Sequence, residues 1–245
     1  MKMLAMDTST LVMGIAVLHL EEKRVLGELT TNLHKNHSVR LMPALDQLLG
    51  DLELNMSDIQ ALAVSAGPGS YTGIRIGVTT AKTMSWALGL PLYSESSLTV
   101  LAMNGLRFDG VVVPLFDARR RRVYSGVYRR EGERMVEQIP QQVVEVDLWL
   151  EQIAELNQPA LFLGDDVVRF EEVIRRRLGE KARFGTAAEN IPRASQLGML
   201  CRHKWANHEP PEHADFSPNY LQMTEAEANW IKKQGNGETS HAQKS

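Results

Sequence analysis

The sequence has 245 residues, of which 43% are hydrophobic and 23% charged, and its formal net charge is −3. That composition predicts a globular chain of one large or two small domains. The slightly negative net charge excludes an overall positive electrostatic potential that would attract nucleic acid. A single cysteine, Cys201, excludes a disulfide framework and a thiolate metal cluster. No apolar run is long enough to span a membrane and no signal-peptide core is recognisable, so we expect a cytoplasmic protein.

The first expected elements are three strands joined by a polar first turn. Apolar runs predict strands at residues 3–6, 13–18 and 25–31. The first turn contains side chains that could face a phosphate or a metal-bound water, namely Asp7, Thr8 and Ser9. The alternative, in which they only close the turn by hydrogen bonds to the backbone, stays open.

An amphipathic helix is expected at residues 38–52. Apolar residues recur there at spacings of three and four, which predicts one apolar face. The members of that face are Val39, Met42, Leu45, Leu49 and Leu52. Pro43 falls inside the pattern and would be costly in a regular helix interior, so we expect a kink or a late helix start.

Residues 67–77, Gly-Pro-Gly-Ser-Tyr-Thr-Gly-Ile-Arg-Ile-Gly, are the most distinctive stretch. They follow an apolar strand at residues 61–64 and open a helix expected to end at Leu88, so the glycines lie in a strand-to-helix turn. Glycine lets the backbone approach a phosphate closely, and the start of a helix offers free amides. The candidate phosphate-facing glycines are Gly67, Gly69 and Gly73.

Two known phosphate-binding patterns fit this stretch poorly. Ile74 stands where a P-loop has its lysine, which excludes that pattern. Thr72 stands where the dinucleotide fingerprint needs its last glycine, although Glu95 lies about where a ribose-binding acid would be. A dinucleotide site and a purely structural tight turn therefore stay open beside the anion site.

The helix after the glycine turn has small residues every four positions, at Gly77, Ala81 and Ser85. Such a row leaves a groove into which a second helix packs closely, and Ile74 and Val78 flank it. The sequence leaves open whether a partner or a helix of the same chain fills this groove.

The second half repeats the order of elements of the first half. The repeat consists of strands at 110–116, 123–128, 135–139 and 160–163, then a helix at 167–178. This order predicts two related lobes, residues 1–107 and 108–225. A last helix is expected at 195–205, a short helix at 226–231, and disorder in the polar remainder of the 226–245 tail.

Several kinds of chemistry lack support in the sequence. The seven histidines form no metal-binding spacing, so we expect no metal site. No Gly-x-Ser-x-Gly turn is present, and Cys201 fits a buried thiol better than a nucleophile. Arginine groups at 119–122, 129–130 and 175–177 could meet RNA phosphates or form solvated faces, and the first group stays open because a strand turn displays its side chains together.

These residues together resemble one family. The run at 67–77 closely resembles the TsaB (YeaZ) family, as do Asp7-Thr8-Ser9, residues 37–43, 81–82, 87–91, 117–119 and 220–221. The resemblance is dense over the first half and sparse after residue 130. It implies an α/β, two-lobed, actin-like ASKHA (ribonuclease H-like) fold, in agreement with the repeated elements.

The resemblance also implies a function. It predicts a non-catalytic subunit that binds the transferase TsaD, with the ATPase TsaE, in N6-threonylcarbamoylation of tRNA adenosine. The tRNA is contacted indirectly, and a homodimer forms when the partner is absent. Residues 94–99 lack the metal-binding histidines of TsaD-type relatives, so no metal or resident cofactor is expected, while a nucleotide at the subunit junction stays open.

The resemblance implies that the contact surface is a helix bundle of the first lobe. The two helices described above, which follow residues 37 and 73, are therefore the expected interface helices. The expected interface residues are Val39, Met42, Leu45, Leu49, Ile74, Gly77, Val78, Ala81 and Ser85. Two alternatives remain beside the subunit hypothesis. One is a nucleotide-binding kinase or ATPase of this fold that acts alone, and the other is a metallopeptidase-like protein.

Overall fold

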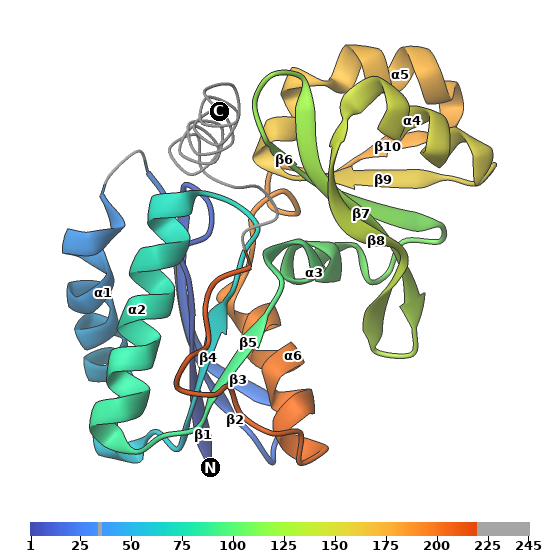
Figure 1. Cartoon of the computed structure of the whole chain (residues 1–245). Coiled ribbons are helices and arrows are strands. Elements are labelled where there is room, and N and C mark those ends of the chain that lie inside the picture. Colours follow the sequence, from blue (N-terminus) through green and yellow to red (C-terminus); the bar gives the residue numbers. More distant parts are fainter. Residues whose placement is uncertain (34–35, 220–245) are drawn as a thin grey trace, which may run out of the picture.

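The computed structural model describes residues 1–33 and 36–219, which form two lobes, each built on a five-stranded sheet (Figure 1). The expected helix at 226–231, the tail and residues 220–221 lie outside the described residues. Within the described chain, no helix is both long and apolar enough to cross a membrane.

The first lobe contains a mixed sheet in the strand order β3-β2-β1-β4-β5. Its strands are β1 (Lys2–Asp7), β2 (Val12–His19), β3 (Arg24–Asn32), β4 (Ala61–Ser65) and β5 (Leu92–Glu95). The first three strands are an antiparallel meander, and β4 and β5 run parallel to β1. The central strands β1 and β4 are apolar and buried almost throughout, as expected where helices cover both faces of a sheet.

The helices of the first lobe divide between its two faces. One face is covered by α1 (His37–Asp51) and α2 (Tyr71–Leu88), which lie side by side, and the other by α6 (Ala194–Ala206) (Figure 1). Because side chains alternate along β1, Leu4 and Met6 pack with α1 and α2, whereas Met3 and Ala5 pack with α6.

The second lobe repeats this topology. Its strands, in the order β10-β9-β6-β7-β8, are β6 (Val111–Asp117), β7 (Arg122–Glu131), β8 (Arg134–Glu145), β9 (Ala160–Leu163) and β10 (Ala182–Phe184). In both lobes the first strand pairs antiparallel with the second and parallel with the fourth. The predicted repeat of elements is therefore confirmed at the level of sheet topology.

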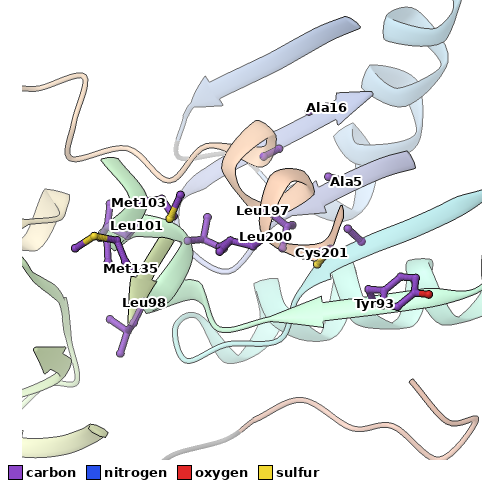
Figure 2. Close-up of a cluster of buried hydrophobic side chains, with 14 of the residues drawn as sticks. Ala5, Ala16, Tyr93, Leu98, Leu101, Met103, Met135, Leu197, Leu200 and Cys201 are labelled. Atoms are coloured by element: carbon purple, nitrogen blue, oxygen red, sulfur yellow. The ribbon is translucent and has the colours of Figure 1, made fainter. Parts of the chain in front are cut away.

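Two further helices complete the second lobe, and a short one joins the lobes. They are α4 (Val146–Glu155), α5 (Glu171–Leu178) and the linking helix α3 (Ser97–Ala102). Single 3₁₀ turns occur at Met56–Asp58, Met103–Gly105, Asp165–Arg169 and Gly179–Lys181. One continuous apolar core crosses between the lobes, and Figure 2 shows Leu98, Leu101 and Met103 gathered with Met135 of the second lobe.

Several expected boundaries need correction. The helix expected at 167–178 is a 3₁₀ turn followed by α5, and α4 and β10 were not predicted. The helix expected to start at Ser38 starts at His37, because the side chain of Asn36 caps it, and Pro43 lies inside it. Helix α6 falls in the range assigned to the second lobe, yet it packs on β1 and β2 of the first.

Candidate functional site

A cleft of about 680 Å³ opens between the lobes, at the carboxyl ends of β1, β4, β6 and β9. This volume lies within the range of small-molecule sites, and carboxyl strand ends are where open α/β sheets bind ligands. From the first lobe it is lined by the β1–β2 turn and the glycine turn, at residues 9–11, 68–72 and 74. From the second lobe and the end of the described chain it is lined by residues 116–120, 122, 124, 166, 169 and 219.

The turn after β1 uses its polar side chains internally. The Oδ1 atom of Asp7 accepts hydrogen bonds from Ser9 N at 2.8 Å and Ser9 Oγ at 2.7 Å. Burial raises the pKa of Asp7, and the bonds from Ser9 oppose that rise. Thr8 Oγ1 donates to Gly73 O at 2.7 Å. These contacts favour the turn-closing alternative, since Ser9 borders the cleft but Asp7 and Thr8 do not.

The glycines of the following loop are needed for packing against this turn. A Cβ atom at Gly69 would lie 2.1 Å from Ser9 O, and one at Gly73 would lie 2.1 Å from Thr8 O. The Ser70 amide donates to Ser9 O at 2.7 Å, so that amide is already used. Gly69 lines the cleft, whereas Gly67 and Gly73 are buried behind it. The close approach that glycine permits here is made to the chain's own backbone.

The second-lobe wall of the cleft carries arginines and two aspartates. Asp117 accepts hydrogen bonds from Arg119 N and from Arg169 Nη1, both at 2.8 Å. Asp166 accepts from Asp117 N at 2.9 Å and pairs with Arg169 Nε at 3.3 Å. Burial raises the pKa of Tyr124 on the same wall, while the positive charges of Arg122 and Arg119 lower it.

Helix α1 does not present the face that its spacing predicted. Leu45 and Leu49 are buried in the core of the first lobe with Leu41 and Leu48, whereas Val39 is 68% and Met42 48% exposed. At 100° per residue the predicted stripe spreads over about 140° of the helix, so its first members lie at the solvent edge. The single apolar face expected from Val39 to Leu52 is therefore corrected.

The small-residue groove of α2 is also occupied within the chain. Ile74, Gly77, Val78 and Ala81 are all buried. A Cβ atom at Gly77 would lie 2.5 Å from Thr8 Oγ1, because the helix packs directly on the β1 turn and on β4. The alternative of a groove filled by the same chain therefore holds for these residues, with a turn and strand in place of a helix. Ser85 Oγ donates to Leu90 O at 2.6 Å at the end of α2.

The residue that the sequence reasoning missed is Trp86, which is 87% exposed on α2. It lies on the helix face opposite the buried row, with Arg75, Thr79 and Thr83. The sequence could have indicated this residue, because it places a tryptophan on the helix face opposite an apolar row. An exposed tryptophan there is unusual for the surface of a monomer and is typical of interfaces.

Cys201 and the residues at the end of β5, among them the candidate ribose-binding acid Glu95, make contacts within the chain. Burial raises the pKa of the Cys201 thiol, which is fully buried. Glu95 pairs with Lys204 at 3.1 Å, and Ser94 Oγ donates to Glu212 at 2.6 Å. Among residues 1–33 and 36–219, no group of three or more histidine, cysteine, aspartate or glutamate side chains could hold a metal ion.

Two lobes of one mixed-sheet topology that meet at a cleft define an actin-like, ribonuclease H-like α/β protein of the ASKHA class. The family model described as "TsaD: tRNA N6-adenosine threonylcarbamoyltransferase" matches residues 24–230. The tRNA threonylcarbamoyladenosine biosynthesis protein TsaB of Bacillus subtilis is 45% identical over 234 residues, which cover 96% of this chain and 100% of that relative. The chain belongs to the TsaB family of tRNA threonylcarbamoyladenosine biosynthesis proteins.

Other relatives agree with this assignment. The solved structure of YeaZ from Pseudomonas aeruginosa has a TM-score of 0.72 and 26% identity, and the match covers 89% of this chain and 99% of that chain. TsaB of Haemophilus influenzae is 34% identical over 134 residues, which cover 54% of this chain and 56% of that relative. The resemblance expected from residues 67–77 and the two-lobed fold are both confirmed.

Proposed function

We propose that this chain is a non-catalytic subunit that binds and supports a TsaD-type transferase, with the ATPase TsaE, in tRNA N6-threonylcarbamoylation. The observation that carries the proposal is an uncovered helix layer in the first lobe. Helices α1 and α2 lie side by side on the outside of the sheet (Figure 1). They leave large apolar side chains exposed, which are Val39, Met42, Tyr71, Trp86 and Leu88.

We call the exposed sides of α1 and α2 the outer helix face, and define it by Val39, Met42, Thr79, Thr83 and Trp86. Tryptophan and methionine are enriched in protein interfaces, and a few such anchors carry most of the binding energy. Val39 and Met42 were also expected at the interface from the sequence, whereas the other expected members on α1 and most of those on α2 are buried within the first lobe. The same face would pair two copies of the chain when the transferase is absent, and tRNA would be contacted through the transferase.

The internal use of the glycine turn supports a role without catalysis. Two of the three glycines that resemble a phosphate cradle, Gly69 and Gly73, approach Ser9 and Thr8 of the same chain. The stretch is therefore explained by the packing of α2 on β1, which positions the outer helix face. Its close backbone approach requires no bound substrate.

Co-purification with the transferase and measurement of the modified nucleoside test the proposal. Val39→Asp on α1 and Val168→Asp on the second lobe are a matched pair, because the two valines are 68% and 72% exposed. A charge at Val39 should weaken the complex at least about tenfold, as should Trp86→Ala, because both remove anchor contacts. Val168→Asp should leave the complex unchanged.

Two results would count against the outer helix face. One is a Val39→Asp or Trp86→Ala variant that co-purifies with the transferase as wild type does. The other is an equal loss in Val168→Asp, which would indicate a general effect of surface charge. Turnover of ATP or another substrate by the isolated chain would contradict the non-catalytic role itself.

A further inference from the structure

We propose that the segment that follows Asn219, residues 220–227, binds in the cleft between the lobes and blocks the cleft from within the chain. This autoinhibitory contact goes beyond the proposed partner function, because it concerns the cleft and not the outer helix face. Asn219 is the last described residue before this segment, and it lines the cleft itself. The covalent chain therefore delivers the segment to the cleft.

The described residues before this segment, 209–219, run along the first lobe toward the cleft (Figure 1). Glu212 N donates to Leu92 O at 2.8 Å, at the amino end of β5. Asn219 N then donates to Ala66 O at 2.8 Å, just beyond the carboxyl end of β4. Strand β5 runs parallel to β4, whose carboxyl end lies at the cleft. The order of these contacts therefore directs the chain after Asn219 into the cleft.

The first-lobe wall of the cleft offers apolar surface to such a segment. Leu11 and Tyr71 are large exposed side chains, and both line the cleft. The segment begins with residues of the same character, which are Tyr220, Leu221 and Met223. Apolar and aromatic side chains gain free energy when they leave water to pack against one another. The residue types that come first in the segment thus match the wall from which the chain arrives.

The second-lobe wall carries more positive than negative charge. Two aspartates lie among its four arginines, which are Arg119, Arg120, Arg122 and Arg169. Arg169 contacts both aspartates, Asp117 at 2.8 Å and Asp166 at 3.3 Å, and so compensates them. The three arginines of the β6–β7 turn are then left to set a positive potential on this side of the cleft.

The segment has the complementary charge. Residues 220–227 contain Glu225 and Glu227 and neither arginine nor lysine. An extended chain advances about 3.3 Å per residue, so Glu225 lies within about 20 Å of Asn219 and reaches the opposite wall. Guanidinium and carboxylate groups form strong, charge-assisted hydrogen bonds. Because the segment is tethered, its effective concentration at the cleft is high, and even a weak contact is well populated.

Hydrogen exchange of the full chain, followed by mass spectrometry, tests the contact. Amides in a bound segment exchange slowly, so those of residues 220–227 should exchange at least about tenfold more slowly than those of residues 236–245, after correction for sequence. The amides of β1 in the same spectra report whether the fold is intact. Protection that is lost on dilution would show that a second copy supplies the segment, which would overturn a contact within one chain.

A matched pair of variants tests the arginine wall. Arg120→Gly removes a guanidinium that lines the cleft, whereas Arg121→Gly removes one that pairs with Asp147 at 2.7 Å and is not part of the lining. Both arginines have left-handed backbone, with φ angles of 53° and 56°, so glycine relieves each of them alike. We expect Arg120→Gly to speed exchange in residues 220–227 at least about threefold and Arg121→Gly to change it less than about 1.5-fold.

A second pair of variants tests the segment itself. The double substitution Glu225→Lys/Glu227→Lys should release the segment, because it places positive charge against the arginine wall, whereas Glu238→Lys should have no effect on its exchange. The proposal is overturned if residues 220–227 of the wild type exchange as fast as residues 236–245. It is also overturned if either control releases the segment as much as its counterpart, or if protection survives both test variants. None of these results depends on the transferase, so they leave the proposed function to its own test.

Discussion

The substitution Gly77→Ala tests whether the small-residue row of α2 serves the fold or a partner. The new methyl group would lie 2.5 Å from Thr8 Oγ1, whose hydrogen bond to Gly73 O is 2.7 Å long. Overpacking a buried site costs about 1–3 kcal/mol and a lost hydrogen bond about 1 kcal/mol, whereas alanine gains about 1 kcal/mol in a helix. We therefore expect a net destabilisation of about 1–3 kcal/mol.

Urea unfolding followed by circular dichroism measures this change, and Gly50→Ala is its matched control. Gly50 also lies in a helix, α1, but a Cβ atom there would meet nothing within 4 Å. Gly50→Ala should therefore stabilise the protein by about 0.5–1 kcal/mol. A Gly77→Ala protein as stable as Gly50→Ala would refute the packing argument. A normally stable Gly77→Ala protein that fails to bind the transferase would restore the groove as an interface.

We expect the substitution of two carboxylates, Asp7 and Glu28, to change the stability of the protein in opposite directions as pH rises. Asp7→Asn should become increasingly stable relative to wild type as pH rises above about 4, because burial raises the pKa of Asp7 and the ionised folded form is disfavoured. Denaturant midpoints of both proteins across pH check this, and a constant difference would contradict it. Glu28→Gln should cost about 1–3 kcal/mol at neutral pH and progressively less below about pH 4. Burial raises the pKa of Glu28, but Arg193 at 2.5 Å and Ser195 lower it overall, and the same titration would reject the idea if the cost grew in acid.

Much of the fold could be predicted because strands and helices have short-range periodicity. The repeat of strand, polar turn and strand was readable in both halves, and so was the helix stop at Gly89, which has a φ of 66°. Strand β10 could not be found this way, because it has three residues and depends on pairing with β9. The packing of α6 on the first sheet depends on contacts between the two ends of the chain, which short-range sequence patterns do not indicate.

The candidate site was less predictable for the same reason. A row of small residues has the same appearance whether a partner or the chain itself fills it, and only Thr8, far away in the sequence, decides for Gly77. Likewise, a run of arginines gives no indication of left-handed backbone, which glycine or asparagine would have signalled. The rotation of α1 that buries Leu45 and exposes Val39 also depends on the tertiary contacts of the helix.

The return of α6 to the first sheet has a consequence for biosynthesis. Met3, Ala5, Ala16 and Leu18 share a core cluster with α6, and Gly198 faces Leu18. These strand residues leave the ribosome early, but their cover is translated only after the whole second lobe. Domains usually fold as they emerge, so this nascent chain has to carry an open apolar sheet for most of its synthesis. Chaperone engagement and premature termination would therefore affect this protein mainly through β1 and β2, which are synthesised first.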